Sequence, residues 1–169
     1  AKSYILAGSD IISTNSFGSN YFKLSQYNLQ EKLSEICQTA AQISRKAAGV
    51  DKIVMASIGP TGKFLIMGDV TSEDLYNSFK QQAIAFKKGG ADAVCIETFY
   101  DLDEAQAAIN AVKENTSLEV ICTFTFDKSE IGYKTLMGVS PQQMAETLIT
   151  YGADIIGANC GTGYEDMIE

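Results

Sequence analysis

GADAVCIET (residues 90–98) combines a glycine, a small residue, an aspartate and then an apolar run, and this order recurs twice in the chain. The other two copies, GSDIISTNS (8–16) and GADIIGANC (152–160), align with it without gaps. A glycine of this kind ends a helix, and a short apolar run after it is typical of a strand buried on both faces. Each copy therefore predicts a turn from a helix into a parallel strand, and the shared Gly and Asp are interpreted as the chemistry of that turn.

Strand-like runs and helical patterns alternate along the chain, which is typical of consecutive βα units on a parallel sheet. The strand-like runs are DIISTNS (10–16), KIVMASI (52–58), DAVCIETF (92–99), EVICTFTF (119–126) and DIIGANC (154–160). The helices are expected over about 33–47, from Thr71 with Asp74 in capping-box spacing to KKGG (87–90), from Asp101, and from Ser140 and Pro141 to YG (151–152).

The far end of the repeat is polar. Counted from the aligned aspartate, the fifth and sixth residues are Asn15 and Ser16, Glu97 and Thr98, and Asn159 and Cys160. Buried parallel strands are apolar throughout, so polar groups at matching carboxyl ends need a partner that offsets their desolvation. A ligand is one such partner. For Asn15 and Asn159, hydrogen bonds that tie a strand end to a loop are the alternative.

Loop lengths point to the same edge of the sheet. The connections from strand to helix are long, namely 17–30, 59–70 and 127–139, whereas those from helix to strand are brief. Long loops at the carboxyl ends of parallel strands build the sites of both barrels and open α/β sheets. We therefore expect the functional site at this edge.

Composition excludes several classes of protein. The 169 residues have 46% hydrophobic content, which predicts one domain with a substantial core. The net charge of −8 argues against nucleic acid as a partner. The apolar runs are too short to cross a membrane and no signal-peptide pattern opens the chain, so the expected location is the cytoplasm.

The four cysteines fall into two groups. Cys37, Cys95 and Cys122 lie in apolar patterns and are predicted to be reduced core residues. Cys160 instead stands at a strand end among glycines, where packing does not account for it. The chain has no histidine, so neither a Ser-His-Asp triad nor an imidazole metal ligand can be built from it.

Together these motifs resemble the homocysteine S-methyltransferase family, in particular the homocysteine-binding domain of cobalamin-dependent methionine synthase. The stretches that carry the resemblance are YILAGSDIISTNSFGSNYFKL (4–24), ASIGPTGK (56–63), IETFYDLDEAQAAI (96–109), CTFTFD (122–127) and GANCGTG (157–163). The resemblance implies an α/β fold, the (β/α)8 TIM barrel. Residues 1–169 are then expected to be a partial homocysteine-binding barrel of about five βα units, strands two to six, lacking the first strand and the last two βα units.

The resemblance also implies a zinc ion at the mouth of the barrel. In the family the zinc is held by the cysteine of a G-x-N-C strand end and by a Cys-Cys pair farther along the chain. Cys160 matches the first ligand, and the pair does not occur in this sequence. Zinc deprotonates a coordinating thiol, so the chemistry needs no histidine. The implied reaction is zinc-dependent methyl transfer to the thiol of homocysteine, giving methionine, from methylcobalamin held by another domain or protein.

The resemblance implies roles for several residues toward the substrate. Glu97 matches the family acid that holds the substrate ammonium. Asn15, Asn159 and the backbone of Gly59 and Thr61 in GPTG are candidates for binding the amino-acid carboxylate.

Two alternatives to this function remain open. One is a methyltransferase with another thiol acceptor, and the other is a non-catalytic α/β module that binds a small molecule or acts as a scaffold. Under the barrel interpretation residues 1–169 alone are expected to be inactive, and the remaining strands come from the full-length chain or from another chain.

Overall fold

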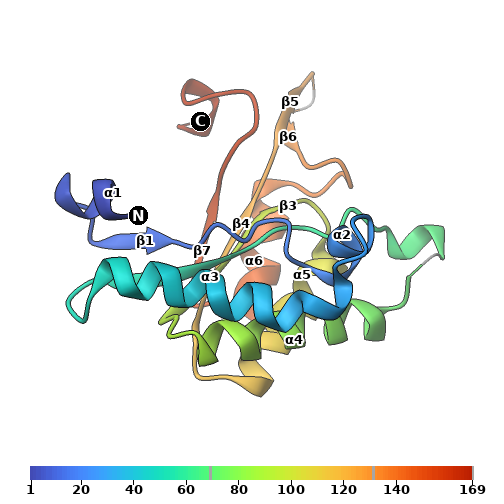
Figure 1. Cartoon of the computed structure of the whole chain (residues 1–169). Coiled ribbons are helices and arrows are strands. Elements are labelled where there is room, and N and C mark those ends of the chain that lie inside the picture. Colours follow the sequence, from blue (N-terminus) through green and yellow to red (C-terminus); the bar gives the residue numbers. More distant parts are fainter. Residues whose placement is uncertain (69, 131, 169) are drawn as a thin grey trace.

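The computed structural model describes residues 1–68, 70–130 and 132–168, in which five parallel strands form one sheet (Figure 1). The strands are β1 (Ile11–Ser13), β2 (Ile53–Ile58), β3 (Ala93–Phe99), β4 (Glu119–Phe124) and β7 (Ile155–Ala158). Their order in the sheet is β1-β2-β3-β4-β7, so each strand pairs in parallel with the strand of the next βα unit. All five predicted strands are thus confirmed.

The helices are α1 (Lys2–Leu6), α2 (Tyr21–Ser25), α3 (Leu33–Ala48), α4 (Ser72–Lys88), α5 (Leu102–Asn115) and α6 (Pro141–Tyr151). The four longer helices, α3 to α6, connect the strands and lie along one side of the sheet, whereas α1 precedes β1 (Figure 1). Short 3-10 turns are η1 (Gln30–Lys32), η2 (Leu65–Met67) and η3 (Glu165–Met167), and a separate antiparallel hairpin is made of β5 (Asp127–Ser129) and β6 (Gly132–Lys134). None of the described helices is long and apolar enough to cross a membrane.

The predicted helix caps are present. Thr71 and Asp74 form a capping box at the start of α4, and Ser140 forms the same motif with Gln143 before α6. The Asp101 carboxylate accepts from the amide groups of residues 103 and 104 at the start of α5. These local bonds satisfy amide groups that the first turn of a helix leaves without partners, which is why the starts of these helices were predictable from the sequence.

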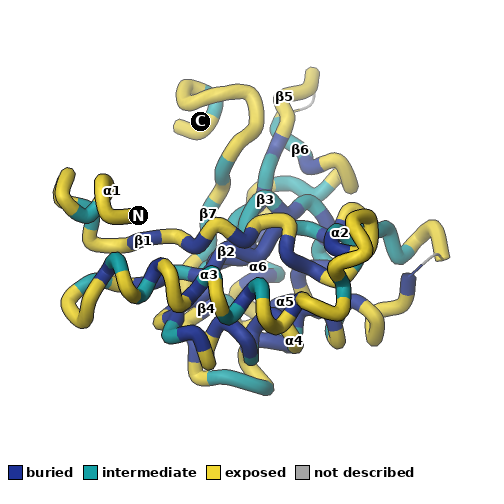
Figure 2. Tube along the Cα trace, in the orientation of Figure 1, coloured by how far each residue is buried: buried dark blue, intermediate teal, exposed yellow. Residues whose placement is uncertain are grey.

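The core lies between the sheet and the helices (Figure 2). Strand residues that share one face by register, such as Ala56, Val94 and Val120, are fully buried against α3, α4 and α5. On the opposite face Ile11, Ile53 and Ile155 are 48%, 44% and 54% exposed. Successive side chains of a strand point to opposite faces, so the sheet has one covered face and one open face. Among the described residues β1 and β7 form its two edges.

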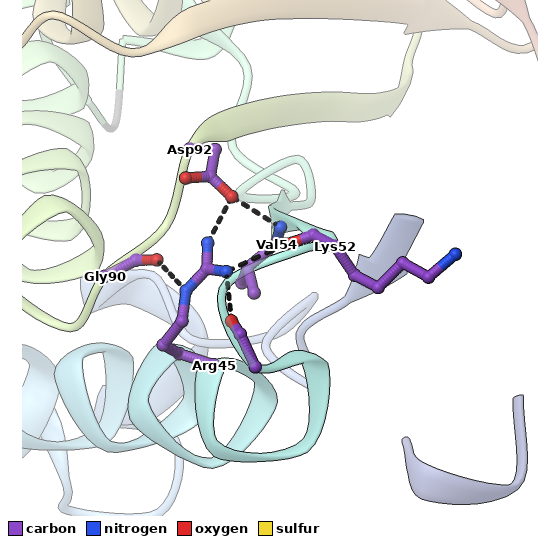
Figure 3. Close-up of polar contacts among 6 residues, drawn as sticks. Arg45, Lys52, Val54, Gly90 and Asp92 are labelled. Carbon is purple, nitrogen blue, oxygen red and sulfur yellow. Dashed lines mark hydrogen bonds and ion pairs between the residues drawn. The ribbon is translucent and has the colours of Figure 1, made fainter. Parts of the chain in front are cut away.

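Asp92, the repeated aspartate of the central copy, closes the turn into β3 (Figure 3). Its carboxylate accepts from the Val54 amide at 2.8 Å and pairs with the Arg45 guanidinium. Arg45 also donates to the carbonyl of Gly90 at 3.0 Å and to that of Lys52 at 2.8 Å. One arginine thus fastens the end of α3 to the starts of β2 and β3.

The other two repeated aspartates, Asp154 and Asp10, also form bonds at the amino ends of the strands. The Asp154 carboxylate accepts from Lys113 Nζ at 2.5 Å and from the Val120 amide at 2.7 Å, and these two bonds lower the pKa of Asp154. Asp10 pairs with Lys52 at 2.5 Å. The repeat is confirmed as turn chemistry at the amino ends of the strands, which leaves the carboxyl ends for function.

Candidate functional site

The carboxyl ends of β3, β4 and β7 are joined by the side chain of Asn159. Its Oδ1 accepts from the Thr98 amide at 3.0 Å and from Thr123 Oγ1 at 2.7 Å. Its Nδ2 donates to Thr98 Oγ1 at 2.8 Å and lies 3.3 Å from Cys160 Sγ. Thr98 directly follows Glu97, so three of the predicted site positions, Glu97, Asn159 and Cys160, come together at one edge of the sheet.

Two residues of this group have left-handed backbones. Thr98 has φ of 63° and Cys160 has φ of 60°, and both occupy the sixth position after a repeated aspartate. A non-glycine residue in this region is uncommon, and a β-branched one such as Thr98 is an outlier. The cost is of the order of 1–3 kcal/mol per residue, and such strain concentrates at functional sites.

Cys160 differs from the other cysteines in its surroundings. Cys37, Cys95 and Cys122 are buried, and Cys160 is exposed. Burial raises the pKa of Cys37 and of Cys95 to about 11 and raises the pKa of Cys122 further, so these three thiols stay protonated. The prediction that three cysteines pack in the core is confirmed, and Cys160 is the cysteine whose sulfur solvent can reach.

Glu97 stands on the open face of the sheet. It continues the row that begins with Ala93 and Cys95, and its side chain is half-buried. Ser57 Oγ on the neighbouring β2 donates to Glu97 Oε1 at 2.5 Å. A carboxylate has further acceptor capacity, and charge-assisted bonds to a cation are among the strongest that it makes.

The GPTG loop, residues 59–62, is held to the protein through its own donors. The Gly59 amide donates to the Phe17 carbonyl at 3.1 Å. A Cβ on Gly59 would lie 2.7 Å from the Phe17 ring and from its carbonyl oxygen, so the close approach of these two segments requires glycine. The Thr61 amide and hydroxyl both donate to Glu104 Oε1, at 2.7 and 2.5 Å.

Glu104 is a buried acid that our sequence reasoning missed. It is 1% exposed, and its Oε2 is a buried oxygen for which the described residues supply no hydrogen-bond partner. Burial raises its pKa from 4.5 to about 7, against the opposing effects of the Thr61 donors and of Lys23. The signal in the sequence was its position four residues before Ala108, on the apolar stripe of α5.

Asn15 lies apart from this group. It follows β1, at the opposite edge of the sheet from β7, and its side chain is exposed. Together with Ser13 and Thr39 it lines a hollow of about 490 Å³ between β1 and α3. The structure therefore does not bring Asn15 together with Cys160, and its role toward a substrate stays a prediction.

Cys160 is the candidate metal ligand of this edge. Within residues 1–68, 70–130 and 132–168 no group of three or more His, Cys, Asp or Glu side chains could hold a metal ion. The exposed sulfur with an N–H donor 3.3 Å away fits a thiolate ligand, because such donors stabilise charge on sulfur. The described residues would thus supply one ligand, where a catalytic zinc usually has three from protein.

Solved structures resemble this fold. The homocysteine methyltransferase MmuM from Escherichia coli, in its metallated form, has a TM-score of 0.80 at 21% identity, over 97% of this chain and 62% of that one. At this identity the likeness shows the fold: the sheet and its helices correspond to part of a (β/α)8 TIM barrel, as the resemblance implied.

Sequence relatives point the same way. The chain is 28% identical to methionine synthase from Mycobacterium leprae and 27% identical to that from Mycobacterium tuberculosis, in both cases over 176 aligned residues. These alignments cover 99% of this chain but 15% of each relative, so the chain spans a small part of the proteins that it matches. The profile of the homocysteine S-methyltransferase family matches residues 1–169. The chain therefore belongs to the homocysteine S-methyltransferase family.

Proposed function

We propose that this chain forms part of an enzyme that transfers a methyl group to the thiol of homocysteine, giving methionine. The observation that carries the proposal is the exposed Cys160 sulfur, which Asn159 joins to the strand end that bears Glu97. Family membership and the two methionine synthase relatives support this acceptor. Methylcobalamin, bound by another domain or protein, is the proposed donor.

In this proposal the metal ligand and the substrate-binding acid have separate tasks. Cys160 holds a zinc ion, which when bound would lower the pKa of a coordinating thiol. Glu97 faces the open side of the sheet and pairs with the substrate ammonium, so that the amino acid is held at a fixed distance from Cys160. Asn15 is the remaining candidate for the substrate carboxylate. The amide groups of Gly59 and Thr61, the other candidates from the sequence, already donate within the protein. The thiol of homocysteine releases its proton to solvent, and its sulfur then forms the new bond to the methyl carbon as the bond between that carbon and the donor breaks, with the bonding electron pair staying on the donor.

The same proposal requires more protein than these residues. The open face with its exposed isoleucines at 11, 53 and 155 is covered by further barrel strands, from the full-length chain or from another chain. The relatives are far longer than this chain, which supports additional domains, and we propose that one of these domains binds cobalamin. The reduced, buried cysteines are consistent with the cytoplasm as the location that we propose.

Replacing Cys160 by Ser in the complete protein tests the proposal. Serine is a poor zinc ligand, so zinc content and homocysteine methylation should both be lost. Cys95→Ala and Cys122→Ala serve as controls and should mainly lower the melting temperature, because these residues are buried. Normal zinc content and turnover in Cys160→Ser would refute the assignment. Turnover in the unaltered protein with a different thiol, and none with homocysteine, would favour the other-acceptor alternative.

A further inference from the structure

The side-chain amide of Asn159 has its whole hydrogen-bonding capacity engaged within the protein. An amide oxygen accepts two hydrogen bonds and an NH2 group donates two. Oδ1 accepts from the Thr98 amide and from Thr123 Oγ1, and Nδ2 donates to Thr98 Oγ1 and to Cys160 Sγ. The Thr98 amide can only donate, which fixes the orientation of the Asn159 side chain. No donor or acceptor is left for a substrate carboxylate.

Two of the three residues that bond to the Asn159 side chain have left-handed backbones. Thr98 and Cys160 have φ of 63° and 60°, and each is bonded to the Asn159 amide. Such conformations persist when the surroundings over-determine them. Thr98 sets the direction of the chain directly after Glu97, and the backbone of Cys160 sets the direction of its sulfur. One amide therefore links the position proposed for the metal to the position proposed for the substrate ammonium.

We propose that Asn159 is a positioning residue for the methyl-transfer site, rather than a ligand of the substrate carboxylate. It holds Thr98 and Cys160 in their left-handed conformations, aims the Cys160 sulfur and donates an N–H group to it. This inference rests on the proposed function for the identity of the metal. The bonding of Asn159 to β3 and β4 does not depend on that function.

Two variants of the complete protein, Asn159→Asp and Asn159→Ala, separate the hydrogen bonds that the Asn159 side chain accepts from those that it donates. The aspartate has nearly the same shape and can still accept from the Thr98 amide and from Thr123, but it cannot donate to Thr98 Oγ1 or to Cys160 Sγ. The alanine loses all four bonds. Asn115→Asp is a matched control at the end of α5. It likewise removes two hydrogen bonds that an Nδ2 group donates, here to the Tyr76 hydroxyl and to the Ala111 carbonyl.

The first measurement is zinc affinity, by competition with a chromophoric chelator. Loss of a partner that orients a metal ligand typically costs 10–100-fold in affinity, so we expect a decrease of about that size in both Asn159 variants and none in Asn115→Asp. The second is amide hydrogen exchange of the zinc-free protein across residues 96–99. Exchange should accelerate in Asn159→Ala and stay close to wild type in Asn159→Asp, because only the alanine removes the acceptor of the Thr98 amide.

Kinetics at saturating zinc distinguish the two roles of Asn159. A ligand of the carboxylate would raise the KM for homocysteine in both variants while zinc affinity and exchange stay unchanged, and that result would overturn the inference. Weaker zinc binding together with faster exchange in Asn159→Ala supports it. Normal zinc content and turnover in Cys160→Ser would refute the proposed function, whereas unchanged exchange in Asn159→Ala would refute the positioning role alone.

Discussion

Two acidic side chains near the carboxyl edge of the sheet have opposite surroundings. Glu97 stands on the open face and accepts one hydrogen bond from Ser57, whereas Glu104 is buried beneath the GPTG loop. An acid that solvent can reach is available to a cationic group, and a buried one favours its protonated form. The two residues are therefore expected to respond differently to removal of the charge.

For Glu97 we expect a loss of substrate affinity. Glu97→Gln keeps the shape of the side chain but removes a charge-assisted hydrogen bond, so homocysteine binding should weaken by roughly 1.5–3 kcal/mol. A homocysteine analogue without the amino group should bind equally poorly to both forms, as calorimetry of the complete protein can measure. Glu114→Gln, at the exposed end of α5, is the control. Unchanged homocysteine affinity in Glu97→Gln would contradict the assigned contact.

For Glu104 we expect an effect on stability that depends on pH. Its folded pKa of about 7 lies above its ordinary value of 4.5, so between these pH values the folded protein binds more protons than the unfolded one. The free energy of unfolding therefore falls as pH rises through this window, on the order of 3 kcal/mol in all. Glu104→Gln cannot ionise, so its unfolding free energy should lack this fall.

Urea unfolding of the complete protein at pH 5 and pH 8 measures the effect. The difference in unfolding free energy between Glu104→Gln and wild type should shift in favour of the variant from pH 5 to pH 8. For Glu114→Gln this difference should be the same at both pH values. Parallel pH profiles for wild type and Glu104→Gln would show that the buried carboxyl does not titrate in this range.

At the scale of helices and strands, the predictable parts are those whose cause lies within a few residues. The capping box of Thr71 and Asp74 and the Gly152 turn, with φ of 92°, are local, and the sequence located them. Helix α2 was missed although Asn20 caps it, because its five residues are too few to show a period. The β5-β6 hairpin was missed because it lies inside a long loop.

In the candidate site, too, the features with a local cause were predictable from the sequence, and those that depend on distant residues were not. The aligned repeat placed Glu97, Asn159 and Cys160 at matching strand ends, and the structure brings them to one edge. The bonds of Asn159 to Thr98 and Thr123 join residues 61 and 36 positions apart. A single sequence contains no direct signal of such distant pairs, nor of the positive φ at Thr98. The burial of Glu104 likewise depends on Thr61, which is 43 positions away.

For the whole molecule, the open face of the sheet decides behaviour in solution. The edges β1 and β7 present backbone groups without strand partners among the described residues, and Ile11, Ile53 and Ile155 are about half exposed. A closed barrel has no such edges and buries its inner face. Unpaired edges beside apolar surface promote association between chains, and the repulsion from the net charge of −8 that opposes it is screened by salt beyond about 10 Å.

We therefore expect residues 1–169, expressed alone, to aggregate or to associate with a partner that supplies strands. They should bind zinc weakly, because Cys160 supplies one ligand where a catalytic zinc usually has three, and they should not methylate homocysteine. Light scattering, zinc stoichiometry and a methylation assay measure these properties. In a matched variant, Ile11→Lys with Ile155→Lys should reduce association, since charge on an edge strand blocks pairing, without restoring zinc binding. A soluble monomer of the unaltered segment with stoichiometric zinc and turnover would contradict the requirement for further strands, since an open sheet would then be sufficient for the chemistry.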